Sequence, residues 1–157
     1  PMVLAVLGSV FDIEGLINQI DDEIQVNGRE EMTGSDLIKE MEWMRSPGRT
    51  SAQKQARCDQ IEGRKVAFDF EKAYVDDVED VRVWIPYEGP RQRAIVRIHL
   101  PDKELEMKVG VSDENEAMKA LRLSKGTEVK HVTGRIFLID RNDYSRVELR
   151  DSVIVVK

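Results

Sequence analysis

Arginines, a tryptophan and a histidine alternate with apolar residues between positions 81 and 100, a pattern that suits ligand recognition better than catalysis. Alternation with a period of two is typical of a half-buried strand, whose successive side chains point to opposite faces. If the apolar residues line the core, the outward face carries Ile95 together with Arg82, Trp84, Arg93, Arg97 and His99. Guanidinium groups neutralise phosphates and an indole stacks on bases, so this face predicts a site for single-stranded nucleic acid.

The charge of the whole chain restricts how such a site could work. The 157 residues include 24 Lys/Arg and 30 Asp/Glu, for a net charge of −6 and a pI near 5.1. This balance excludes a protein held to nucleic acid or anionic lipid by bulk charge. Between Val81 and His99, however, four arginines face one glutamate, a local charge of +3. Binding must therefore be local, and Lys108 and Arg135 are predicted at the rim of the site.

A second interpretation of the same face is a protein interface. Residues 1–63 hold 6 basic and 12 acidic side chains, whereas residues 64–157 hold 18 of each. An acidic N-terminal extension could dock on a basic strand face by charge complementarity, and Trp84 would then be covered rather than free. The alternative function is thus a protein interaction or assembly module that uses this face or the N-terminal helices, either with a protein partner or as a homo-oligomer.

Motifs of catalysis and of metal binding are missing from the sequence. His99 and His131 are the two histidines and belong to no metal-binding spacing, and the acidic clusters do not follow the calcium-loop pattern. Neither a phosphate-binding glycine loop nor a nucleophile elbow occurs. The single Cys58 excludes an internal disulfide and is expected to be a small buried residue. We therefore predict a non-enzymatic protein without a cofactor or metal ion.

Three helices are predicted before residue 64. Apolar residues recur at helical intervals from Phe11 to Ile24, and a second helix begins at Thr33 or Ser35 and ends at the Ser46-Pro47-Gly48 breaker. The third helix begins with a capping box, in which Thr50 is followed three residues later by Gln53, and Gly63 ends it.

From residue 64 onward the apolar residues alternate with polar ones, which predicts strands. We expect them at 64–70, 81–86, 93–100, 127–140 and 146–156, with a turn at Asp76-Asp77, a bend or bulge at Gly134 and a possible short strand at 107–111. A helix capped by Ser112 separates the third expected strand from the fourth.

This element order predicts a mainly β protein with a helical N-terminal extension. Five strands with a helix between the third and fourth are typical of the OB-fold, a Greek-key barrel that binds oligonucleotides and oligosaccharides. The predicted division is an acidic helical extension at 1–63 and an OB-fold domain at 64–157. A three-helix cap on a four-stranded α+β sheet is the remaining alternative, since an SH3-like barrel has no helix at that position.

Two stretches near the C-terminus resemble a known family. They are LSKGTEVKHVTGRI, from Leu123 to Ile136, and VELRDSVI, from Val147 to Ile154. They are similar to the last strands of the small tRNA-anticodon-binding-like OB-fold domains of prokaryotic proteins. The opening of the domain, from Gln53 through Gly63 to Val66, is similar to the entry of those domains. The resemblance implies an OB-fold and no particular activity.

A cytoplasmic location is expected from the hydropathy pattern. The longest uncharged apolar run, from Met2 to Phe11, is about half of the roughly 20 residues that a membrane-spanning helix needs. No basic residue precedes this run in the sequence, as a signal peptide would require. We therefore expect no association with a membrane.

Overall fold

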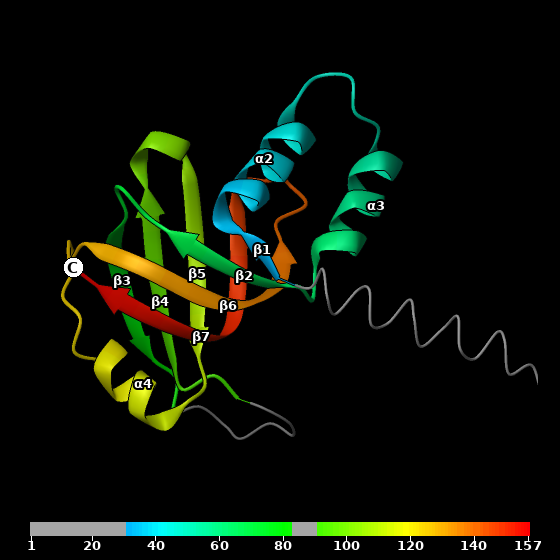
Figure 1. Ribbon diagram of the computed structural model, residues 1–157. Coiled ribbons are helices and arrows are strands. Elements are labelled where there is room, and N and C mark those ends of the chain that lie inside the picture. The colour runs from blue at the N-terminus through cyan, green and yellow to red at the C-terminus, as the bar shows by residue number, and fades with distance from the viewer. Residues whose placement is uncertain (1–30, 83–90) are drawn as a thin grey trace, which may run out of the picture. The chain divides into compact units, whose positions relative to one another are not determined.

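A single mixed sheet forms the centre of the structure, a computed structural model that describes residues 31–82 and 91–157 (Figure 1). Within those residues the sheet has seven strands in the order β1-β2-β6-β7-β5-β4-β3. The strands are β1 (Glu31–Thr33), β2 (Lys65–Asp69), β3 (Tyr74–Asp80), β4 (Ala94–Leu100), β5 (Leu105–Val111), β6 (Val129–Ile139) and β7 (Arg146–Val156). The pair β5–β7 is parallel, whereas β2–β6, β3–β4, β4–β5 and β6–β7 are antiparallel.

Three α-helices accompany the sheet in the described part of the chain: α2 (Gly34–Arg45), α3 (Ser51–Ile61) and α4 (Glu114–Ala120). A 3-10 turn, η1 (Pro101–Lys103), joins β4 to β5. Residues 32–157 make one compact unit. In these described residues no helix is long and apolar enough to cross a membrane.

The predicted five-stranded Greek-key OB-fold barrel is wrong. The fold is α/β, with one open seven-stranded mixed sheet and three helices in the described residues, and it is not the alternative four-stranded sheet either. The error began at Asp76-Asp77, which are typical turn residues but lie here within strand β3. Strand β5 is also a full seven residues long rather than a short optional strand.

The open sheet is nevertheless strongly curled. Only residues 70–73 connect β2 to β3, although these strands stand five places apart in the strand order. Five strand spacings of about 4.8 Å would span roughly 24 Å in a flat sheet, more than the roughly 17 Å that this connection can reach. The start of β3 therefore meets the segment before β6, where the Val75 N–H donates to the Thr127 carbonyl at 2.9 Å. This contact is an isolated bridge and leaves the remainder of the sheet open.

Helix starts are the part of the fold that the sequence predicted best. The Thr33 side chain accepts a hydrogen bond from the Asp36 N–H at 3.0 Å and begins α2. The predicted capping box of α3 is confirmed, because Thr50 and Gln53 bond reciprocally at 2.9 and 3.1 Å. The helix before β6 is also confirmed, but its N-cap is Asp113 rather than Ser112.

Strand predictions are confirmed in part. The predicted strands at 93–100 and 146–156 correspond to β4 and β7, and β6 passes without a break through Gly134, where the ladder with β7 is bulged. A strand at 81–86 is not confirmed, since residues 83–90 lie outside the described part of the chain. The first predicted helix, at 11–24, lies outside it as well, and the domain boundary at residue 63 stays a prediction.

The core lies on the concave face of the curled sheet. Helix α2 contributes Leu37, Met41 and Met44, all fully buried, and α3 contributes Cys58 and Ile61. The sheet contributes the alternate residues of each strand, such as Val96 and Ile98 on β4 and Val147 and Leu149 on β7. Because the inward residues form the core, the intervening side chains of β4, β5 and β7 point outward.

Candidate ligand-binding groove

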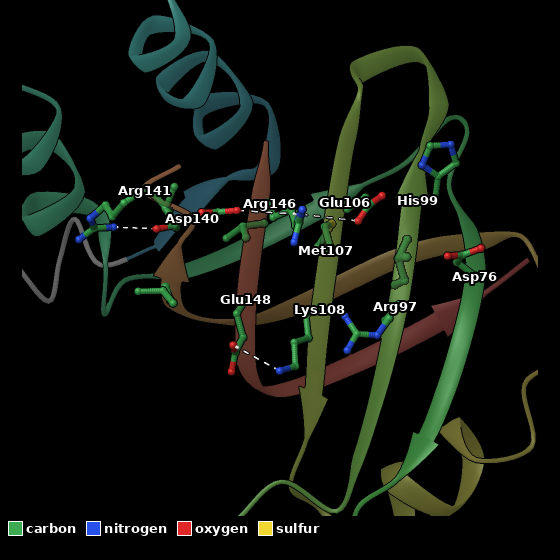
Figure 2. A pocket seen from close by; sticks show the side chains of 14 residues that line it. Asp76, Arg97, His99, Glu106, Met107, Lys108, Asp140, Arg141, Arg146 and Glu148 are labelled. Carbon is green, nitrogen blue, oxygen red and sulfur yellow. Dashed lines mark hydrogen bonds and ion pairs between the residues drawn. The ribbon is translucent and has the colours of Figure 1, made fainter. Parts of the chain in front are cut away.

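The outward side chains of four strands surround a groove of about 330 Å³ (Figure 2). Strands β4, β5, β6 and β7 and the turn after β6 supply most of its lining, with one residue from β3. The polar lining residues are Asp76, Arg97, His99, Glu106, Lys108, Asp140, Arg141, Arg146 and Glu148, and the apolar ones are Ile98, Met107, Leu138, Ile139 and Val147.

Two positive charges lie directly opposite each other in the centre of the groove. Arg97 of β4 is the cross-strand partner of Lys108 of β5, and the side chain of Arg97 extends toward β5 in Figure 2. Like charges in this arrangement destabilise a sheet. The Arg97 side chain makes no hydrogen bond or ion pair with another described residue, although its cross-strand neighbour on β3 is the acidic Asp77. Its guanidinium is exposed and lines the groove, so it is available to a ligand.

Glu148 links the cations on the β7 side of the groove. Its carboxylate lies 3.8 Å from the Lys108 Nζ and 3.2 Å from the Arg150 Nε. Arg150 in turn lies over the ring of Phe137, with its guanidinium carbon 3.4 Å from the ring centroid. Phe137 is 46% exposed, which is unusual for a phenylalanine. An aromatic surface covered by an arginine therefore lies next to the cationic centre.

The end of the groove near the turn after β6 is charge-balanced. Arg146 lies 3.9 Å from Glu106 and 4.0 Å from Asp140, within reach of both carboxylates. Counted over the whole lining, Arg97, Lys108, Arg141 and Arg146 are matched by four acidic residues. The groove is thus neutral overall, with its unpaired positive charge concentrated at Arg97.

Helix α3 holds one wall of the groove in place. Arg141, in the turn after β6, makes a two-pronged ion pair with Glu62 at the C-terminus of α3, with a distance of 2.9 Å from Nη2 to Oε1. The Ile139 N–H also donates to Glu62 at 2.9 Å. Burial raises the pKa of Glu62, but the hydrogen bonds from Arg141 and Ile139 outweigh it and hold the pKa below its ordinary range. The contact with Glu62 raises the pKa of Arg141.

This ion pair predicts a pH dependence of stability. A carboxylate whose pKa is lower in the folded state stabilises the fold above its unfolded pKa, near 4.3, and this stabilisation is lost as the pH falls through the folded pKa. We expect Glu62→Gln to lose less unfolding free energy than the wild type between pH 5 and pH 3, as measured by urea titration. Glu42→Gln, an exposed change on α2, serves as the control and should follow the wild-type profile. Parallel profiles for Glu62→Gln and the wild type would contradict the assignment.

The structure brings only some of the predicted site residues together. Arg97, His99 and Lys108 come together in the groove. The guanidinium groups of Arg93 and Arg135 instead donate to the backbone carbonyls of Ser112 and Gly63. Arg82 pairs with Asp80 at 2.7 Å at the end of β3, where its hydrogen bonds lower the pKa of Asp80 to about 2. Trp84 lies outside the described residues.

The sequence did not identify the residues that β7 contributes to the groove. Arg146, Glu148 and Arg150 alternate with apolar residues, a pattern typical of outward-facing positions on a strand. It carried no sign that β7 runs parallel to β5, with Glu148 beside Lys108 and Arg146 beside Glu106. Parallel pairing between segments separated by a helix and a long strand leaves no local pattern.

No arrangement for metal binding or nucleophilic catalysis is found in the part of the chain that the structure describes. It contains no cluster of three or more His, Cys, Asp or Glu residues placed to hold a metal ion. Cys58 is buried, and burial raises the pKa of its thiol despite the opposing charge of Arg141. A thiol with a raised pKa is a poor nucleophile.

Comparisons with known proteins provide no further assignment. Family models, curated proteins and solved structures were compared with the chain, and none of them matches it. The similarity of residues 123–136 and 147–154 to OB-fold domains therefore stays a resemblance of short motifs.

Proposed function

We propose that this protein is a non-catalytic binding module that holds single-stranded nucleic acid in the groove across β4, β5 and β7. The observation that carries the proposal is the cross-strand pair Arg97 and Lys108, two cations side by side with Arg97 unpaired among the described residues. A phosphate between them would accept charge-assisted hydrogen bonds from both cations, in addition to the partial compensation that Glu148 gives Lys108.

The surroundings of this pair suit a single strand. Phe137 and Arg150 provide an aromatic ring and a guanidinium plane, and both groups stack on bases without regard to base identity. Leu138, 44% exposed, adds apolar surface beside them. The groove lies on the outward face of the sheet, opposite the core, and a flexible single strand can follow it across β4, β5 and β7.

The proposal predicts a defined loss of affinity in Arg97→Ala. Phosphate contacts on single strands make log K fall with log salt at about 0.7 per cation, so removing one cation should weaken binding roughly fivefold to tenfold at 0.05 M salt. The slope should also become shallower by about 0.7. Fluorescence anisotropy with a labelled 12-nucleotide DNA and an RNA of the same sequence, at 0.05 M and 0.2 M salt, measures both quantities.

A matched control separates this site from general charge. Arg122→Ala removes the same charge from an exposed position after α4 that does not line the groove, and it should bind nearly as the wild type does. Both variants should keep the wild-type melting temperature within a few degrees, because the changes are at exposed positions. Equal losses in the two variants, or no wild-type binding at 0.05 M salt, would exclude the groove as a nucleic-acid site.

A second candidate function, a protein interaction module, is favoured by a different surface. One row of outward residues across β2, β6 and β7 is small or apolar, with charged residues on either side of it: Ala67 pairs with Thr133, which pairs with Val153, and Val155 follows on β7. Val153 and Val155 are 40% and 44% exposed. Association through this face would be almost insensitive to salt, and sedimentation at 0.05 M and 0.5 M salt distinguishes it from phosphate binding.

A further inference from the structure

Glu148 places a carboxylate among the cations of the groove, and the inference drawn from it rests on the proposed function. Its carboxylate lies 3.8 Å from Lys108 on the neighbouring strand β5 and 3.2 Å from Arg150 on its own strand β7. The Glu148 side chain is 21% exposed, whereas those of Lys108 and Arg150 are 39% and 40% exposed. The carboxylate therefore lies deeper than the cations that it bridges.

A carboxylate in this position makes the same contacts that a ligand phosphate would make. Both are anions with oxygen acceptors, and both form charge-assisted hydrogen bonds with Lys and Arg. We propose that Glu148 is a built-in counter-ion, which the phosphates of a bound strand displace from Lys108 and Arg150, and that it thereby limits the affinity of the groove for polyanions.

The contacts of Glu148 are of a kind that a ligand can displace. Ion pairs between partly exposed side chains contribute little to stability, because water screens them and two flexible side chains must be ordered. Neither contact is two-pronged, in contrast to the pair of Glu62 with Arg141, which has two parallel hydrogen bonds and a third from the backbone. Glu62 therefore keeps its contact with Arg141 and holds the wall of the groove, whereas ligand phosphates can take the place of the Glu148 carboxylate.

Displacement would also uncover the aromatic surface. Arg150 is held between the Glu148 carboxylate and the Phe137 ring, and it covers one face of that ring. A phosphate that draws Arg150 toward the centre of the groove leaves the ring face open to a base. Phosphate binding and base stacking are thus linked through one arginine.

The test is the salt dependence of oligonucleotide binding by Glu148→Gln. This change keeps the shape of the side chain but frees two cations, so the log–log slope should become steeper by about 1.4, twice 0.7. The affinity of Glu148→Gln relative to the wild type should then grow about sevenfold between 0.2 M and 0.05 M salt, which is four to the power 1.4. The same labelled 12-nucleotide DNA and RNA serve as probes.

Glu106→Gln is the matched control. It makes the same change of net charge in the same groove, but its partner Arg146 keeps the Asp140 carboxylate at 4.0 Å. Its slope should stay close to that of the wild type. Thermal melting of all variants shows whether any difference in binding comes from a change in folding.

The outcomes distinguish this inference from the function on which it rests. A steeper slope in Glu148→Gln and not in Glu106→Gln supports the built-in counter-ion. Equal slopes in the two variants, or no change in Glu148→Gln, overturn it, and the proposed function still stands if Arg97→Ala weakens binding. If neither the wild type nor Glu148→Gln binds either probe at 0.05 M salt, both the inference and the proposed function are wrong.

Discussion

Gly134→Val is expected to destabilise the protein by about 3 kcal/mol or more, at or above the upper end of what overpacking usually costs. A Cβ at position 134 would lie 2.3 Å from the Ser152 Oγ, 3.1 Å from the Ser152 Cβ and 3.2 Å from the Arg150 carbonyl oxygen. Ser152 is 1% exposed and cannot turn outward. This is the bulged part of the β6–β7 ladder, where Asp151 has a φ of +53°. Urea unfolding of the variant measures the loss.

A double-mutant cycle tests the cause of that loss. The Ser152 Oγ is buried and has no hydrogen-bond partner among the residues that the structure describes, so Ser152→Ala alone should be neutral or slightly stabilising. Gly134→Ala should be less destabilising in the Ser152→Ala background than in the wild type, since the closest atom has been removed. If Gly134→Val melts within a degree of the wild type, the close approach of β6 and β7 is wrong.

Gly34→Ala is the second change with a large expected effect, about 2–3 kcal/mol. Gly34 is the first residue of α2 and lies against the Phe68 ring of β2, where a Cβ would meet Cδ1 at 2.1 Å and Cγ at 2.6 Å. The Phe68 ring is buried and stacked on Phe70 at 5.2 Å, so it cannot move aside without disturbing that pair. Urea unfolding measures the loss.

The control for this prediction is Gly48→Ala. Gly48 has a φ of +87° and nothing within 4 Å of a Cβ, so Ala should cost only about 1–2 kcal/mol of backbone strain. Combining Gly34→Ala with Phe68→Leu should cost less than the sum of the two single changes, because the smaller side chain relieves the contact. If the losses of unfolding free energy in the two single variants simply add in the double variant, the close contact between Gly34 and the Phe68 ring is wrong.

Short-range signals accounted for the local structure that could be predicted. The Thr50 and Gln53 capping box, the strand at Ala94–Leu100 and the outward position of Arg97 and His99 all follow from residues within a few positions of one another. Tyr74–Asp80 shows where this approach fails. Its two adjacent aspartates favour a turn in isolation, but pairing with β4 makes the segment a strand.

The sequence by itself determined which residues alternate in the strand at 93–100, and therefore that Arg97 and His99 point away from the core. Only the tertiary structure decided that Arg97, His99, Lys108 and Glu148 line one groove, with Arg150 beside Glu148. The parallel pairing of β5 with β7 places Glu148 beside Lys108, and the seven-strand order, with β1 and β3 at its edges, makes an open sheet of the expected barrel. The physical reason is that side-chain alternation comes from the local geometry of each strand, whereas strand order depends on the summed burial and hydrogen bonding of segments far apart in the chain.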